Sequence, residues 1–197
     1  MKLHLTLRSP YARKCRVLAL EKGIDLELVQ EDLVHKSPEL LAKNPLGKIP
    51  ILELDDGRVL LDSSVISAYL DSLTESPKFI PSEEKDRLRV LNTDALGKNL
   101  TDVTVVLFYE MLYHPEDFNK NYVNRLEETI GRSLQYFNDH IAEVKGFHLG
   151  SFSVATALGY LCFRHGRLWS DEKYPQLAKW YAQISQRKSM AETRPVG

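Results

Sequence analysis

The sequence predicts a chain of two parts, an α/β N-terminal domain followed by an all-α C-terminal domain. Short strand-like runs, beginning with KLHLTL at residues 2–7, alternate with helical segments in the first part. The stretch TESPKFIPSEEK, at residues 74–85, holds two prolines and little periodicity, as a linker does. Beyond it the periodic segments have helical spacing. We therefore expect a domain of residues 1–75, a linker of residues 76–83 and a helical domain of residues 84–197.

The first part has the predicted element order β-α-β-α-β-β-α. Leu3, Leu5 and Leu7 alternate onto one face of the first strand, and Gly23 can end the helix that follows. This helix joins two strands as a βαβ unit, so the two strands should be parallel. The turn DDG predicts a hairpin between the last two strands. The expected strands cover residues 2–7, 26–30, 49–54 and 58–62, and the expected helices cover residues 11–23, 37–44 and 63–73.

The second part is predicted to be helical throughout. Between residues 119 and 144, an apolar stripe runs from Tyr122 to Ile141 at helical spacing. The first half of the segment 153–166 is almost entirely apolar, which indicates a buried helix. The expected helices cover residues 83–112, 119–144, 153–166 and 174–190.

Composition argues against several classes of function. The chain has 26 Lys and Arg against 27 Asp and Glu, and this balance gives no electrostatic argument for a nucleic-acid or membrane partner. Cys15 and Cys162 lie far apart and form no C-x-x-C motif, which suits a reducing compartment. The six histidines have no metal-ligand spacing, so we expect no metal. No segment has the apolar length of a signal peptide or a membrane span, and we expect a cytoplasmic protein.

Four motifs occur in a specific order along the chain. Ser9-Pro10-Tyr11 follows the first strand, NPLGKIP covers residues 44–50, Asp62-Ser63 precedes a helix, and SMAETRP covers residues 189–195. In order and spacing they resemble the motifs of the glutathione transferase family, in its bacterial, serine-type form. The resemblance implies a thioredoxin-like N-terminal domain, an all-helical second domain and a homodimer. It also implies that Ser153 caps a helix, with Thr156 at the position where the family usually has Asp.

Ser9 stands where serine-type members carry the catalytic serine. A free thiol such as that of glutathione has a pKa of about 8.5, and lowering it by about two units requires about 2.7 kcal/mol of preference for the thiolate. A hydroxyl that donates to the anion supplies about 1.5 to 3 kcal/mol, and the positive end of a helix adds about 0.3 to 1 kcal/mol. The functional interpretation is that Ser9 donates to the glutathione thiolate. The structural alternative is that Ser9 only caps the helix.

Cys15 is the competing candidate for a reactive group. It lies inside the expected helix, where a cysteine is more often a small buried residue. The active-site frame Cys-Pro-Tyr-Cys of glutaredoxins is here Ser9-Pro10-Tyr11-Ala12, so both thiols of a dithiol shuttle are absent. We therefore expect the reactive sulfur to come with glutathione and Cys15 to belong to the core.

The remaining glutathione-binding residues follow from the resemblance. It implies that the Ile49-Pro50 bond is cis, so that the backbone of Ile49 pairs with the cysteinyl backbone of glutathione. Ser63 would hold the γ-glutamyl carboxylate at a helix start, with Asp62 near the ammonium group. Tyr11 belongs to the first turn after Ser9. The candidates for the glycine carboxylate are Lys36 and Lys48, and His35 could substitute for them.

These residues predict an enzyme that activates the thiol of glutathione, its co-substrate, for attack on a small apolar electrophile. Phe108, Tyr109, Met111, Leu112 and Tyr113 could line the electrophile site, although core packing is the preferred interpretation of this stripe. Two alternatives stay open. One is a glutathione-dependent isomerase on the same scaffold, and the other is a non-catalytic, transferase-like interaction module.

Overall fold

The computed structural model describes residues 1–196, which form two compact units. The first unit contains Met1–Ile80 and the segment from Lys188 onward, and the second contains Pro81–Arg187. The segment after residue 187 therefore groups with the α/β unit, whereas the sequence placed it in the helical half. No helix within residues 1–196 has both the length and the apolar character needed to cross a membrane.

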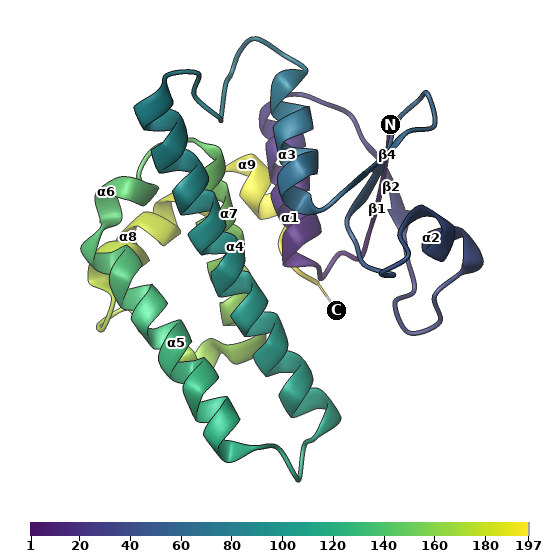
Figure 1. The fold of residues 1–197 in the computed structure, drawn as a ribbon. Helices are drawn as coiled ribbons and strands as arrows, with labels where there is room; N and C mark the ends of the chain where they lie inside the picture. Colours follow the sequence, from purple (N-terminus) through teal and green to yellow (C-terminus); the bar gives the residue numbers. More distant parts are fainter. Residues whose placement is uncertain (197) are drawn as a thin grey trace. The chain divides into compact units, whose positions relative to one another are not determined.

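A four-stranded sheet forms the centre of the first unit (Figure 1). Its strands are β1 (Lys2–Leu5), β2 (Glu27–Gln30), β3 (Ile51–Glu53) and β4 (Val59–Leu61), and they lie in the order β2-β1-β3-β4. β1 pairs with β2 in parallel and with β3 in antiparallel, and β3 pairs with β4 in antiparallel. The predicted βαβ unit and hairpin are both present, and the thioredoxin-like fold is confirmed.

The helices of this unit are α1 (Pro10–Glu21), α2 (Pro38–Lys43), α3 (Ser63–Ser72) and α9 (Lys188–Glu192). Figure 1 shows α1 and α3 side by side on one side of the sheet and α2 on the other. Alternation along β1 sends Leu3 and Leu5 to one face, where both are completely buried. His4 points to the opposite face.

The C-terminal segment attaches to α1 through a buried arginine. Arg13 donates from Nη2 to the carbonyl oxygen of Met190 at 3.0 Å and from Nε to Oγ1 of Thr193 at 3.3 Å. Ser189 donates to the carboxylate of Glu21 at the other end of the helix. These polar contacts explain why the segment belongs to the first unit.

The second unit is helical, as predicted. Its helices are α4 (Glu84–Tyr113), α5 (Lys120–Asp139), α6 (Ile141–Val144), α7 (Leu149–His165), the short 3₁₀ helix η1 (Gly166–Leu168) and α8 (Pro175–Ile184). α7 is buried along most of its length and packs closely against α4. A Cβ atom on Gly97 would lie only 2.7 Å from the backbone nitrogen of Val154, so the small residue permits this close approach.

The start of α7 differs from the expectation. The helix begins at Leu149 and is capped by His148, whose Nδ1 accepts from the backbone N–H of Ser151 at 3.1 Å. Ser151 in turn accepts from the N–H of His148 at 3.1 Å, which completes a capping box. The predicted cap at Ser153 is wrong, because Ser153 lies inside the helix and donates to the carbonyl oxygen of Asp94 at 3.1 Å.

Candidate active site

The register of the sheet brings the predicted site residues to one edge. His4 pairs with Ile51, and Ile51 pairs with Leu61, so β1 and β4 end at the same edge where β3 begins. β2 ends at this edge as well, because it is parallel to β1. The loops that carry the candidates all adjoin this edge: Ser9 and Tyr11 after β1, Lys36 after β2, Lys48, Ile49 and Pro50 before β3, and Asp62 and Ser63 after β4.

Ser9 caps α1. Its Oγ accepts from the backbone N–H of Ala12 at 3.2 Å, so the capping interpretation is correct. A hydroxyl group that accepts one hydrogen bond can still donate its own hydrogen. Within residues 1–196 the Ser9 hydroxyl has no recorded acceptor. Capping and donation to a thiolate are therefore compatible, and Ser9 is half-buried beside the half-buried Tyr11 at the positive end of the helix.

Cys15 is completely buried, as expected. Its Sγ lies 3.7 Å from the carbonyl oxygen of Ser63 and 4.0 Å from Oγ of Ser67. A sulfur without access to solvent cannot serve as a nucleophile for a diffusing substrate. Its contact with the first residue of α3 instead connects α1 to the other predicted site segment.

The start of α3 holds a buried hydroxyl group without a partner. Ser63 is only 1% exposed, and its Oγ makes no hydrogen bond to any described residue. Leaving a buried polar group unpaired costs about 1 to 3 kcal/mol, so a water molecule or a ligand atom that pairs with this hydroxyl would be stabilised here. Asp62 precedes it with a positive φ of 68° and caps the helix by accepting from the N–H of Ser64 at 2.8 Å. The carboxylate of Asp62 is exposed.

The loop of residues 44–50 leads into β3 and, within residues 1–196, leaves backbone groups without partners next to that strand. The Ile49-Pro50 bond is cis, which confirms that part of the prediction. The ladder between β1 and β3 stops at Ile51, and among the described residues the N–H and C=O of Ile49 have no recorded partner. Two unpaired backbone groups next to a strand can pair with the backbone of a bound peptide.

Asn44 organises this loop and was missed by the sequence reasoning. It is buried, its Nδ2 donates to the carbonyl oxygen of Lys48 at 2.8 Å, and its Oδ1 accepts from the N–H of Leu46 at 3.1 Å. Asn44 is the first residue of the motif NPLGKIP, and an asparagine that bonds its own backbone is a common turn signal. That signal could have identified it as the residue that shapes the loop.

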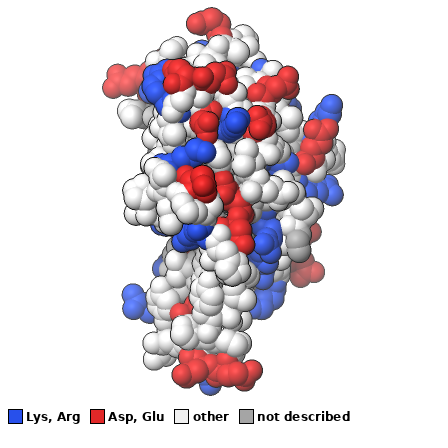
Figure 2. Space-filling view, turned by 90° about the vertical axis from the view of Figure 1, so that its right-hand side faces the viewer, with Lys and Arg blue, Asp and Glu red and all other residues white. Residues whose placement is uncertain are grey.

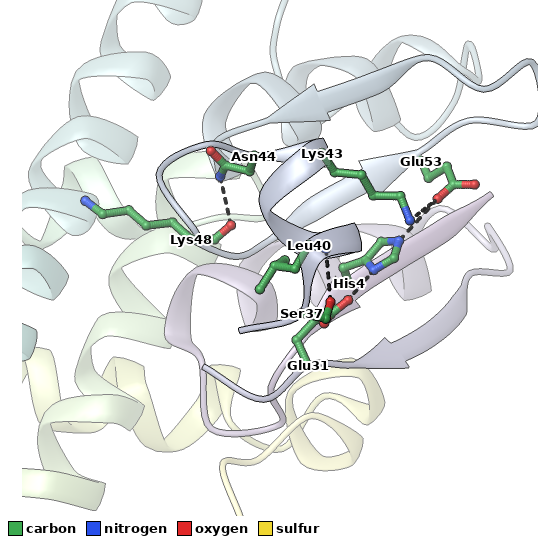
Figure 3. A network of polar contacts seen from close by, with 8 residues as sticks. All are labelled: His4, Glu31, Ser37, Leu40, Lys43, Asn44, Lys48 and Glu53. Atoms are coloured by element: carbon green, nitrogen blue, oxygen red, sulfur yellow. Dashed lines mark hydrogen bonds and ion pairs between the residues drawn. The ribbon is translucent and has the colours of Figure 1, made fainter. Parts of the chain in front are cut away.

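Lys36 and Lys48 both belong to this region and are exposed. Gly47 has a φ of 58°, and a Cβ atom there would lie 2.8 Å from Cδ of Lys36 and 3.1 Å from its Nζ. The side chain of Lys36 therefore lies directly over Gly47. Figure 3 shows the side chain of Lys48 extending away from α2. This region thus carries two cationic side chains, one from Lys48 of the loop itself and one from Lys36, which covers Gly47.

His35 is less suitable as a ligand than either lysine. Its Nδ1 pairs with the carboxylate of Asp32 at 3.1 Å, and its backbone N–H donates to the other oxygen of that carboxylate at 3.0 Å. These hydrogen bonds, with a further one from the N–H of Val34, lower the pKa of Asp32.

No group of three potential metal ligands occurs in the part of the chain that the structure describes. On the face shown in Figure 2, acidic and basic side chains are interspersed, in keeping with the nearly neutral chain.

The chain is similar to known proteins along nearly its whole length. A family model described as the N-terminal domain of glutathione S-transferases matches residues 3–78. The uncharacterized GST-like protein YibF of Escherichia coli K12 is 31% identical over 200 residues, which cover 99% of this chain and 98% of that protein. The chain belongs to the glutathione S-transferase family.

Two solved structures similar to this glutathione S-transferase contain glutathione or a derivative of glutathione. A family member from Pseudomonas fluorescens Pf-5 with bound glutathione is 40% identical, has a TM-score of 0.92 and matches over 100% of this chain and 99% of that chain. A second structure of the family member from this strain contains S-(propanoic acid)-glutathione and matches with a TM-score of 0.90 at 40% identity.

Proposed function

We propose that the protein is a serine-type glutathione transferase in which Ser9 donates a hydrogen bond to the thiolate of glutathione. The unpartnered, buried Oγ of Ser63 is the observation that carries this proposal. It lies at the start of a ten-residue helix, where backbone N–H groups and the helix dipole favour a carboxylate. The γ-glutamyl carboxylate of glutathione supplies such a group, and the exposed carboxylate of Asp62 attracts the adjacent ammonium.

The rest of the tripeptide fits the other features of the edge. The unpaired backbone groups of Ile49 bind the cysteinyl residue as a short antiparallel strand. This pairing fixes the direction of the cysteinyl side chain. We assign the Ser9 hydroxyl as the hydrogen-bond donor to its sulfur. Lys36 and Lys48 are the cations for the glycine carboxylate. Binding at both ends and in the middle fixes the sulfur in one place, which a single contact could not do.

The helical unit supplies apolar surface for a small electrophile. Tyr109, Leu112 and Tyr113 at the end of α4 are all exposed, with Tyr113 at 69%, so the preferred interpretation of the stripe as core is wrong for these three residues. Phe108 and Met111 are half-buried. The rings of Tyr109 and Tyr113 stack with their centroids 5.5 Å apart. We propose an apolar electrophile on this basis. We further expect a homodimer in the cytoplasm, which size-exclusion chromatography with light scattering and cell fractionation would test.

Isothermal titration with glutathione tests the proposal directly. The wild type and Ser82→Ala, which removes an exposed serine, should bind glutathione and show the ultraviolet absorbance of its thiolate near neutral pH. Ser9→Ala should bind glutathione but lose most of the thiolate signal and most of the conjugating activity. Ser63→Ala should weaken binding, because it removes the hydroxyl assigned to the γ-glutamyl carboxylate. Absence of binding by the wild type would overturn the proposal.

Product analysis separates the alternatives. A transferase consumes glutathione in step with the electrophile, whereas an isomerase turns over its substrate and leaves glutathione unchanged. A non-catalytic module would show neither reaction and no thiolate. A panel of small electrophiles with different leaving groups and double bonds would therefore distinguish all three functions.

A further inference from the structure

His4 is a buried histidine on the face of the sheet opposite to Leu3 and Leu5. It is 4% exposed and lies in β1, the strand that pairs with both β2 and β3. Figure 3 shows its ring between two carboxylates, with α2 close by. The ring is therefore placed between the sheet and the helix that leads into the loop of residues 44–50.

Each nitrogen of the ring faces a carboxylate oxygen. Nδ1 lies 2.6 Å from Oε1 of Glu31, and Nε2 lies 3.4 Å from Oε2 of Glu53. An ionised carboxylate only accepts hydrogen bonds, so the form of His4 that donates to both carboxylates at once carries a hydrogen on both ring nitrogens. The positions of the two carboxylates therefore favour the imidazolium form of His4.

A lysine of α2 completes the cluster. Nζ of Lys43 lies 2.9 Å from the same oxygen of Glu53 that His4 approaches. The hydrogen bonds from Lys43 and then from His4 lower the pKa of Glu53, and the charge of Lys2 adds a weaker attraction. With His4 charged, Glu31 and Glu53 each contact a positive group, since His4 lies beside both carboxylates and Lys43 beside Glu53. A neutral His4 would leave the mostly buried carboxylate of Glu31 without its positive partner, which is unfavourable.

The cluster joins the sheet to the glutathione loop. α2 has only six residues, too few to be stable without tertiary contacts. Lys43 is its last residue, and the next residue, Asn44, holds the carbonyl oxygen of Lys48. At the other end of α2, Ser37 caps the helix by accepting from the N–H of Leu40 at 3.1 Å and adjoins Lys36. A shift of α2 would therefore move both lysines of the proposed site.

We propose that His4, as an imidazolium between Glu31 and Glu53, is a positioning residue that holds α2 and the loop of residues 44–50 in place for glutathione. The chain of contacts runs from His4 through Glu53 to Lys43, and through the backbone to Asn44 and Lys48. His4 does not itself touch glutathione. The role in glutathione binding rests on the proposed function, whereas the role in holding α2 does not.

The protonation of His4 can be measured in the wild type. In a spectrum of protein labelled with ¹⁵N at histidine, both ring nitrogens of His4 should have the shifts and attached hydrogens of an imidazolium at about pH 7. His114 is exposed and provides an internal reference. A His4 ring with one unprotonated nitrogen at this pH would overturn the proposal, whatever the variants show.

Variants test the effect on α2 and on the ligand. We choose S-methylglutathione as the probe, because it has no ionisable thiol and its affinity does not depend on Ser9 donating to an anion. His4→Leu and Lys43→Met should each weaken its binding about tenfold, or about 1.4 kcal/mol. Lys43→Arg and the control His114→Leu should bind it as the wild type does. In the first two variants, hydrogen exchange should accelerate for the amides of α2 and not for those of α3.

The outcomes distinguish this proposal from the proposed function. Unchanged exchange in α2 together with unchanged affinity in His4→Leu and Lys43→Met would refute the positioning role. If the wild type binds no S-methylglutathione, the proposed function fails instead, and the exchange rates of α2 still decide whether His4 holds the helix. If His4→Leu does not fold, the positioning role is tested by the binding and hydrogen exchange of Lys43→Met and by the ¹⁵N spectrum of the wild type.

Discussion

Lys22 and Asp71 form a buried ion pair that joins the end of α1 to the end of α3. Nζ of Lys22 lies 3.2 Å from Oδ1 of Asp71, and both side chains are almost completely buried. Lys22 also donates to the carbonyl oxygen of Pro77 at 2.6 Å. Asp71 accepts further from the N–H groups of Phe79 and Ile80, at 2.9 and 3.0 Å. The carboxylate of Asp71 thus holds α1 and α3 together and also fixes the segment that follows α3.

Removing one charge of this pair should destabilise the protein strongly. Lys22→Met leaves Asp71 buried without its countercharge, and we expect a loss of about 3 kcal/mol in the free energy of unfolding. Urea titration followed by circular dichroism measures it. Lys188→Met, which breaks the exposed pair with Glu192, should change stability by less than about 1 kcal/mol. Equal effects of the two variants would contradict the assignment of the buried pair.

Gly47 should be required for the position of Lys36. Gly47→Ala introduces a side chain at a positive φ, and its Cβ would overlap Cδ of Lys36. We expect loss of one charge-assisted contact and about tenfold weaker binding of glutathione, measured by titration calorimetry. Gly57→Ala is the matched control, because Gly57 also has a positive φ, of 83°, but nothing lies within 4 Å of its Cβ position. Both variants should lose stability, and only Gly47→Ala should lose affinity.

His148 should make the stability of the protein depend on pH. Burial, and then the charge of Arg89, lowers the pKa of His148, and its Nδ1 must stay unprotonated to cap α7. The unfolded chain therefore binds the proton first when the pH falls below about 6.5. Stability is fully present above that pH and decreases as the pH falls toward the lower folded pKa. His165 adds to the same trend, because burial lowers its pKa as well.

Thermal unfolding between about pH 8 and about pH 5 measures this dependence. The melting temperature of the wild type should fall across the range. His148→Asn keeps a good capping side chain without a titrating group, so its decrease should be smaller. His114→Asn should behave as the wild type does. A variant His148→Asn with the full wild-type decrease would show that other groups cause it.

Neither cysteine should take part in the reaction. Cys15 is completely buried, and burial raises the pKa of Cys162 to about 11, so almost no thiolate forms near neutral pH. We expect iodoacetamide to leave both thiols unmodified in the native protein and to modify both in urea, as mass spectrometry would show. Cys15→Ala should retain glutathione conjugation within about twofold. If Cys15→Ala folds normally but loses activity, Cys15 takes part in the reaction and this prediction is wrong.

Local sequence patterns predicted the architecture of the first unit. Alternation in KLHLTL, the DDG turn and the crossover helix determine the pairing of the strands, and the pairing brings the loops to one edge. The cis bond at Pro50 was implied by the resemblance of the motif NPLGKIP to the glutathione transferase family, and not by the residues alone. Ser9 was placed correctly at a helix start, and there the capping alternative proved to be true as well.

Features that depend on contacts between distant segments were not predicted. The packing of Lys36 over Gly47 arises only when the loops fold together. The cap of α7 was misplaced because Ser153 finds its acceptor on α4, which no local pattern indicates. The exposed stripe at the end of α4 was assigned to the core for a similar reason, since periodicity alone does not reveal what covers a face.

The contact between Arg13 and the segment of residues 190–193 has a consequence for how the chain is made. α1 is synthesised early, but the carbonyl oxygen and hydroxyl group that Arg13 binds are synthesised after the whole helical unit. A ribosome that has released residues 1–80 has therefore not yet provided all parts of the first unit. Its final packing awaits the last segment, and a fragment ending near residue 187 would leave the guanidinium of Arg13 without these two acceptors.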